Sequence, residues 1–287
     1  MDRKTRNEAV RSVKYVLIAL VTAVWVFPIY WLIVTSLKTR LDMFAIPPKW
    51  SFQLIPDNYI DVFFERRYGL TPGPTEFPKF LMNSFLISLS SIALVIVIGI
   101  LASYSFSRFN MKGKDTWLFF VLSTRMLPPI AVLIPIYFMY QRLGLLNNYV
   151  GLIALYIMFN MAFAVWMMKG FFDEIPRELD EAAMVDGYSR MGAFRKAVLP
   201  QAFTGIAATA VFCLIMAWNE FMFAYILSGF DTRTVPVALA RIRGESGVNW
   251  GTITATEVLY ITPVVIFTYF LQKYLLRGIT FGTIKGR

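Results

Sequence analysis

Long apolar runs separated by short polar segments follow one another along this chain. A run of about twenty uncharged residues can cross roughly 30 Å of hydrocarbon as a helix, at about 1.5 Å per residue. The runs are continuously apolar and do not alternate at every second position, which favours helices over a β-barrel. We therefore predict an all-α membrane protein with six transmembrane helices, near residues 15–37, 80–106, 117–140, 149–168, 202–228 and 252–272.

Composition supports this class. With 57% hydrophobic and 16% charged residues, the chain has too little polar surface to cover a water-soluble globule of 287 residues. The net charge of +10 is spread over the ends of the apolar runs and forms no dense basic stretch, which argues against a nucleic-acid partner. The sequence contains no histidine, which excludes histidine-based catalysis and most zinc sites, and its single cysteine, Cys213, has no disulfide partner within the chain.

The distribution of Lys and Arg predicts the orientation of the helices. An even number of spans places both termini on the same side of the membrane, and cytoplasmic segments are enriched in Lys and Arg. We predict that both termini are cytoplasmic, because Lys and Arg are denser in residues 1–14, 107–116, 169–201 and 273–287 than in residues 38–79, 141–148 and 229–251.

The polar segment before the fifth predicted span has the signals of two short helices. Pro176 suits a first helical turn, and acidic residues follow it where the helix dipole is positive. Gly187 is expected to end this helix and Ser189 to cap a second one, and Pro200 marks the return to the span. From spacing alone, an amphipathic connector lying on the lipid surface is equally compatible.

Particular residues of this segment resemble the EAA loop of the permease subunits of ABC importers, and the match consists of Glu181, Ala182, Ala183, Gly187, Leu199 and Pro200. The sequences AWNEF (217–221), TRTVPVALA (232–240) and RGITFGTIKGR (277–287) resemble the carbohydrate-uptake branch and its maltose-permease-type second subunit. Ala197 departs from the branched aliphatic residue usual in the family. The resemblance implies a type I importer permease fold with an EAA coupling helix, in a bacterial or archaeal cytoplasmic membrane.

The resemblance also implies a division of the chain. Residues 1–79 would hold a cytoplasmic segment, the first span and an outer loop. Residues 80–287 would form the core permease domain of five spans, with the EAA loop at about 170–200, an outer loop at about 229–251 and a cytoplasmic tail at 273–287.

In the family the EAA helix docks on a cytoplasmic ATPase, so the resemblance implies an assembly. Its members would be a second permease forming a heterodimer, a pair of ATP-binding subunits holding ATP and Mg, and an extracytoplasmic solute-binding protein, all within membrane lipid. The expected ATPase contacts are Glu181, Ala182, Ala183, Asp186, Gly187, Leu199 and Pro200, with Gly278, Gly282, Lys285 and Gly286 in the tail. The chain contains no phosphate-binding loop of the G-x-x-x-x-G-K-[ST] type, so we expect no enzyme activity, cofactor or metal in this subunit.

Polar residues inside the predicted spans are candidates for the solute path, because a charge at mid-bilayer is unfavourable unless it is paired or faces a cavity. Two interpretations stay open: Arg125 and Glu220 form an ion pair between helices, or they line the path with Asn160 and Asn219. Pro128, Pro129 and Pro135 are expected to bend the third span.

The loop at 229–251 carries charges suited to a transient interface with the binding protein. The residues concerned are Arg233, Arg241, Arg243 and Glu245, and the alternative is a loosely ordered connector.

The resemblance favours a sugar, oligosaccharide or polyol as solute, with glycerol phosphate or another small solute as the alternative. An ion-coupled secondary transporter or a membrane-embedded enzyme is a different class. We find no convincing repeat between the halves and only one deep carboxylate, whereas secondary transporters usually show repeats and ion-binding carboxylates. A purely structural assembly protein would leave the EAA segment unexplained.

Overall fold

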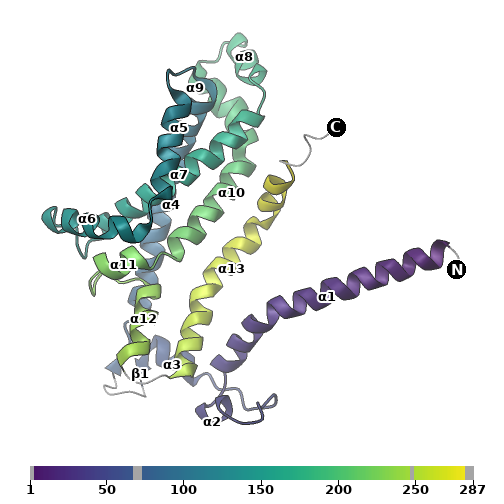
Figure 1. Ribbon diagram of the computed structural model, residues 1–287, viewed down its shortest axis with the longest axis vertical. Coiled ribbons are helices and arrows are strands. Elements are labelled where there is room, and N and C mark those ends of the chain that lie inside the picture. The colour runs from purple at the N-terminus through teal and green to yellow at the C-terminus, as the bar shows by residue number, and fades with distance from the viewer. Residues whose placement is uncertain (1–2, 67–72, 246–248, 282–287) are drawn as a thin grey trace. The chain divides into compact units, whose positions relative to one another are not determined.

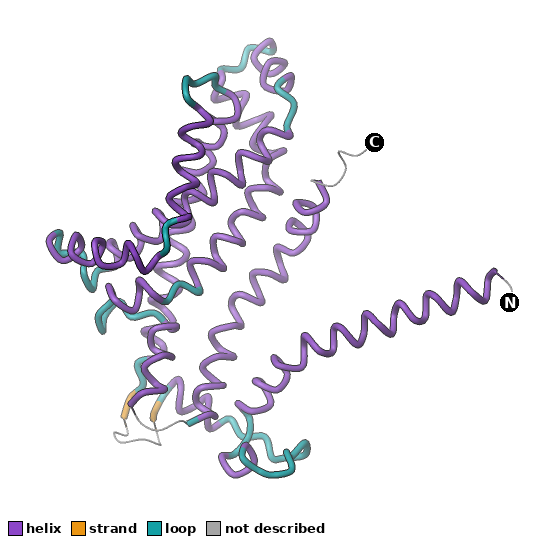
Figure 2. The backbone as a smooth tube through the Cα atoms, in the orientation of Figure 1, coloured by secondary structure: helices purple, strands orange, loops and turns teal. Residues whose placement is uncertain are grey.

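The structure of the chain, a computed structural model, describes residues 3–66, 73–245 and 249–281, with side chains over 11–64, 73–241 and 249–272. Most of the described chain is helical, as Figure 2 shows. Two short strands, β1 (Glu65–Arg66) and β2 (Gly73–Pro74), pair antiparallel, with Glu65 opposite Pro74. The predicted all-α class is therefore confirmed.

The chain divides into two compact units. The first comprises residues 1–77 and 239–262, and the second comprises 78–238 and 263–287. The first boundary lies close to the predicted boundary at residue 79, whereas the return of Leu239–Thr262 to the first unit was not indicated by the sequence. The helices of the first part of the chain are α1 (Arg3–Ser36), α2 (Arg40–Met43) and α3 (Asp57–Phe63).

The longest elements after residue 77 are helices of membrane-spanning length. They are α4 (Phe77–Arg108), α7 (Tyr149–Glu174), α10 (Leu199–Trp218) and α13 (Trp250–Phe281). Shorter elements join them: α5 (Lys114–Ser123), η1 (Thr124–Met126), α6 (Pro129–Arg142), α8 (Glu178–Val185), α9 (Arg190–Ala193), η2 (Phe194–Val198), α11 (Met222–Leu227) and α12 (Val235–Glu245). Among the described residues, five helices are long and apolar enough to cross a membrane, or six if one bent pair is a single span.

The bent pair is the third predicted span. Residues Lys114–Met126 and Pro129–Arg142 meet at 92°. Leu127 is extended (ψ 126°), because a proline disfavours the helical conformation of the residue before it and Pro128 is followed by a second proline. The predicted bend is thus confirmed at Pro128, while Pro135 lies inside α6.

Small residues allow the helices of the second unit to approach closely. A Cβ on Gly99 of α4 would lie 2.9 Å from Met168 Cε of α7, and a Cβ on Gly205 of α10 would lie 2.1 Å from Phe171 Cγ of α7. Figure 1 shows these three helices running alongside one another. Close approach gives the dispersion contacts that hold helices together in lipid, where burial of apolar surface gives little driving force.

Helix α1 has a different environment. Its apolar side chains, including Val24 (71% exposed) and Trp25 (77% exposed), are largely uncovered within the described chain. An apolar surface of this length requires lipid or another protein to cover it.

Candidate functional site

The segment that resembles the EAA loop forms a helix, a glycine turn and a second helix at one end of the second unit (Figure 1). Helix α8 has three acidic residues in its first turn, where they complement the helix dipole. Gly187 follows with φ +91°, and the N–H groups of Gly187 and Tyr188 donate to the carbonyls of Met184 (3.1 Å) and Ala183 (3.1 Å). The hydroxyl of Ser189 accepts from the N–H of Gly192 over 3.2 Å and caps α9. The two-helix elbow is therefore confirmed.

One side of this elbow is open to contact. Glu181, Ala182, Asp186 and Gly187 are exposed, while Ala183 is half-buried. Val185, on the same helix, is 87% exposed. Of the two remaining residues of the match, Leu199 is half-buried and Pro200 is exposed.

Pro200, predicted to mark the return to the span, lies inside a continuous helix. Residues Arg190–Trp218 form one helix of 29 residues that contains α9, η2 and α10. Within it η2 is a π-helical turn, in which the N–H of Leu199 donates to the carbonyl of Phe194. Pro200 has no N–H to donate, and this wider turn allows the helix to continue through the proline.

The opposite side of α8 is held by a buried ion pair that the sequence did not reveal. The carboxylate of Asp180 lies 2.7 Å from Nε of Arg108, at the end of α4, and the two side chains are 9% and 5% exposed. The hydroxyl of Tyr104, also on α4, donates to the other oxygen of Asp180 over 2.8 Å. The available signal was helical spacing, because Asp180 shares a helix face with Ala183 and Met184 and not with its neighbour Glu181.

The same arginine also binds the end of α7. Its Nη2 donates to the carbonyl of Ile175 (2.8 Å) and its Nη1 to the carbonyl of Phe172 (3.1 Å). These contacts join the end of α4, the end of α7 and the start of α8 through one guanidinium group.

The predicted ion pair between Arg125 and Glu220 does not form among the described residues. Arg125 Nη2 instead lies 2.8 Å from the sulfur of Met216. The carboxylate of Glu220 accepts from the N–H groups of Phe223 (3.1 Å) and Ala224 (3.0 Å), at the start of α11. The predicted span at 202–228 is therefore interrupted after Trp218, because Glu220 satisfies the open amides of a new helix.

The two asparagines among the candidate residues for the solute path differ in burial. Asn219 is exposed and donates to the carbonyl of Ile215 over 2.8 Å. Asn160 is 4% exposed and donates to the carbonyl of Tyr156 over 2.9 Å, while its Oδ1 has no hydrogen-bond partner within the described chain.

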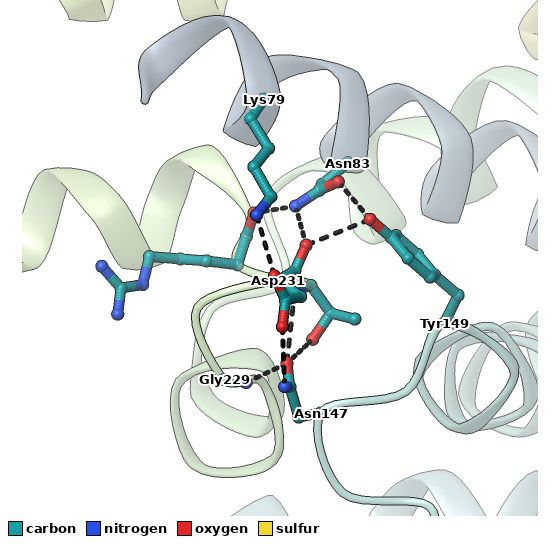
Figure 3. Close-up of polar contacts among 8 residues, drawn as sticks. Lys79, Asn83, Asn147, Tyr149, Gly229 and Asp231 are labelled. Carbon is teal, nitrogen blue, oxygen red and sulfur yellow. Dashed lines mark hydrogen bonds and ion pairs between the residues drawn. The ribbon is translucent and has the colours of Figure 1, made fainter. Parts of the chain in front are cut away.

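A polar cluster, which we call the Asn147 cluster, lies at the end of the second unit where α4 begins (Figure 3). Asn147 Oδ1 accepts from the N–H of Gly229 (3.0 Å) and from both the N–H and the hydroxyl of Thr232. The cluster joins the start of α4, the α6–α7 loop and the loop after α11, and its members are Lys79, Asn83, Asn147, Tyr149, Gly229, Asp231 and Thr232.

Asp231 is the charged centre of this cluster. Its carboxylate lies 2.9 Å from Nζ of Lys79, and its carbonyl accepts from Asn83 (2.7 Å) and from the hydroxyl of Tyr149 (3.0 Å). The ammonium of Lys79, with a smaller contribution from the amide of Asn147, holds the pKa of the Asp231 carboxyl below its usual range.

The described part of the segment at 229–251 contains the eleven-residue helix α12. The guanidinium of Arg233 lies over the rings of Phe80 (5.3 Å) and Phe230 (5.5 Å), and Arg241 is half-buried. The side chains of Arg243 and Glu245 lie outside the described residues, as do Gly282, Lys285 and Gly286 of the tail, whereas the backbone of Gly278 belongs to α13.

Comparison with known proteins identifies relatives that are permeases of transport systems. A family model described as the binding-protein-dependent transport system inner membrane component matches residues 95–281. The sulfoquinovosyl glycerol transport system permease protein SmoH of Agrobacterium fabrum is 34% identical, over 91% of this chain and 89% of that protein. The trehalose/maltose transport system permease protein MalG of Thermococcus litoralis is 32% identical, over 98% of this chain and 99% of that protein.

A solved structure extends this likeness to the fold. A bacterial ABC transporter involved in the import of the acidic polysaccharide alginate superposes with a TM-score of 0.74 at 21% identity, covering 96% of this chain and 98% of that one. The predicted ABC importer permease fold is confirmed by this match. The chain is thus a multi-pass membrane protein that belongs to the family of binding-protein-dependent transport system inner membrane components.

Proposed function

We propose that this chain is one permease subunit of an ATP-driven importer for a sugar, oligosaccharide or polyol. Family membership supports the dependence on a binding protein. The choice of solute is supported by relatives named for trehalose/maltose and sulfoquinovosyl glycerol transport. The alternative solutes are glycerol phosphate and other small molecules, for which Arg125 offers a cation.

The main support for the proposed mechanism is that the two sides of α8 have different surroundings. One side presents Glu181, Ala182 and Val185 to solvent, while the other is fixed to α4 and α7 through Asp180. Small and acidic residues suit a protein socket, whereas a helix on a lipid surface favours Lys, Arg and large apolar residues. In the proposed mechanism the open side docks on a separate ATPase subunit, and closure of the ATPases around ATP and Mg moves the spans.

This mechanism requires that α8 and both termini lie in the cytoplasm, as the Lys and Arg distribution predicts. The tail residues Gly278, Gly282, Lys285 and Gly286 add contacts to the ATPase. A second permease and a pair of ATP-binding subunits complete the assembly, and the exposed apolar surface of α1 is available to lipid or to that second permease.

The solute path is assigned to residues that can exchange hydrogen bonds with a hydroxyl-rich molecule. The strongest candidate is Oδ1 of Asn160, which is buried and has no hydrogen-bond partner among the described residues. A buried acceptor without a partner is energetically unfavourable, so its presence indicates a role such as binding solute. The other residues assigned to the path are Arg125, Asn219 and Glu220.

The segment after α11 is proposed to contact the solute-binding protein through Arg233, Arg241, Arg243 and Glu245. Charge at such an interface fixes register and speeds encounter. Charge reversal at Arg241 and Arg243 should therefore weaken the stimulation of ATPase activity by loaded binding protein, and unchanged stimulation would count against this contact.

Docking of α8 is tested by labelling and transport together. Val185→Cys provides a single reactive site, since Cys213 is fully buried. We expect a membrane-impermeant thiol reagent to label residue 185 only from the cytoplasmic side. We also expect Glu181→Lys and Gly187→Pro to abolish uptake in protein that remains in the membrane, while the exposed first-turn variant Glu178→Gln transports normally.

Two results would overturn the proposal. One is labelling of residue 185 from outside, and the other is solute uptake by this polypeptide without an ATP-hydrolysing partner. The solute itself is identified by measuring ATPase stimulation of the reconstituted complex against a panel of sugars and polyols, with glycerol phosphate included. Stimulation by glycerol phosphate alone would replace the sugar assignment and leave the coupling mechanism in place.

A further inference from the structure

Asp180 and Glu181 are neighbouring acids in α8 with opposite surroundings. Glu181 is exposed, whereas Asp180 is 6% exposed and has both carboxylate oxygens occupied, one by Arg108 Nε and the other by the Tyr104 hydroxyl. Consecutive residues on a helix point about 100° apart, so the two carboxylates serve different surfaces. The exposed surface belongs to the proposed ATPase contact, and the function of the buried one is not accounted for by that contact.

The buried ion pair is unlike a surface salt bridge. Taking two charges out of water is unfavourable, and the arrangement persists only when hydrogen bonds satisfy the remaining donors and acceptors. Here the other guanidinium nitrogens of Arg108 donate to the carbonyls of Phe172 and Ile175, at the end of α7. A pair of this kind gives little net stability and a strongly defined geometry.

Its location connects two transmembrane helices to the short one. Arg108 is the last residue of α4 and Tyr104 lies one turn earlier. The ring of Tyr104 packs against Phe172 of α7 (5.9 Å between centroids) and Phe194 of η2 (4.5 Å). The carboxylate of Asp180 is therefore attached to a closely packed part of the unit.

We infer that Asp180 is a positioning residue that fixes α8 to the end of α4, so that displacement of α8 moves α4 together with α10. This inference rests on the proposed coupling function. It adds a side-chain connection to the backbone connection, because α8 is joined to α10 by the chain and to α4 by the side chains of the Asp180–Arg108–Tyr104 group. Beside this group Arg177, the residue before α8, donates to the carbonyl of Ser107 in α4 over 3.0 Å.

The experiment uses the complete complex of this chain with its partner subunits, reconstituted in lipid. Spin labels are placed at Leu179→Cys in α8, which is not among the proposed ATPase contacts, and at Met111→Cys just after α4. Both positions are exposed, and the distance distribution between them is measured by pulsed electron resonance. Transport and ATP hydrolysis are measured on unlabelled protein. The variants are Asp180→Asn, which removes the charge at constant shape, and Tyr104→Phe, which removes one hydrogen bond and keeps the packed ring. The matched control is Glu178→Gln, an exposed acid in the same helix.

We expect Asp180→Asn to broaden the distance distribution and to lower solute transported per ATP hydrolysed by roughly two- to thirtyfold. Tyr104→Phe should give a smaller loss in the same direction, and Glu178→Gln should change neither quantity. A role in folding alone would lower transport and ATP hydrolysis in proportion to the amount of protein and leave their ratio unchanged.

The outcomes separate this inference from the proposal on which it rests. An unchanged distribution and an unchanged ratio in both Asp180→Asn and Tyr104→Phe would overturn the inference, even where Glu181→Lys abolishes uptake and the docking of α8 stands. Normal uptake in Glu181→Lys and Gly187→Pro would overturn the docking itself. If Asp180→Asn fails to assemble, Tyr104→Phe decides, because its ring contacts are retained.

Discussion

Gly229 lies directly against the side chain of Asn147, since its N–H donates to Asn147 Oδ1 over 3.0 Å and an added Cβ would come within 2.4 Å of Asn147 Cγ. Asn147 cannot easily move away, because its Oδ1 also accepts from Thr232 and its backbone is in the left-handed region (φ +49°). The glycine is therefore required by contact and not by its own backbone conformation.

Gly229→Ala should destabilise the protein by about 1–3 kcal/mol, the usual effect of overfilling a packed site. The thermal midpoint in detergent measures the change. Gly170→Ala in α7 is the matched control, because nothing lies within 4 Å of an added Cβ there and alanine favours the helix by about 1 kcal/mol. Equal midpoints for the two variants would show that the Asn147 cluster tolerates a methyl group.

Asp231 should give the Asn147 cluster a dependence on acid. Its pKa is lowered in the folded protein, mainly by Lys79 and then by Asn147, so its contribution to stability is present above the ordinary carboxyl pKa and is lost as the pH falls through the folded value. The thermal midpoint of the native protein should therefore decrease more steeply in this acidic range than that of Asp231→Asn. Parallel curves for the two proteins would contradict this assignment.

We expect Glu220 to stabilise the protein mainly by accepting hydrogen bonds at the start of α11. Glu220→Ala removes both acceptors from the first amides of α11 and should lower stability by about 0.5–2 kcal/mol. Glu220→Gln keeps one acceptor oxygen and should lose less, as measured by thermal unfolding. A different result would show that the carboxylate acts on the solute and not on α11. In that case both variants would have the same stability, and they would differ from each other in transport.

The effect of a substitution at Gly187 should depend on how readily the new residue adopts a positive φ. Its φ of +91° is unfavourable for residues with a Cβ, so Gly187→Ala should destabilise the elbow by roughly 1–2 kcal/mol and reduce uptake. Asparagine visits the left-handed region more readily, and Gly187→Asn should retain more activity. Uptake assays on matched amounts of membrane protein compare the two, and identical losses would point to a contact at Gly187 in place of a conformational requirement.

Periodicity and length were sufficient to predict the class of the protein and most of its long helices, because lipid requires each spanning segment to satisfy its own backbone. The elbow at Gly187 and the bend at Pro128 were also predicted, since glycine and proline act through local geometry. The interruption at Glu220 was not, because a single carboxylate that binds backbone amides leaves no periodic signal.

The buried pair of Asp180 and Arg108 shows more clearly what a single sequence cannot predict. The two residues are far apart in the sequence, and each has a local explanation, one as an acid in a first helical turn and the other as a basic residue at the end of a span. Only the packing of α4 against α7 and α8 brings them together. A single sequence contains no information on that packing beyond the presence of the two charges.

The π-helical turn at Phe194–Val198 has a mechanical consequence. Because the turn carries the helix through Pro200, Arg190–Trp218 is one continuous helix of 29 residues, about 44 Å long. In the proposed mechanism, a movement of α8 that is applied at the α9 end of this helix would be carried along its length to Trp218, next to two residues assigned to the solute path, Asn219 and Glu220.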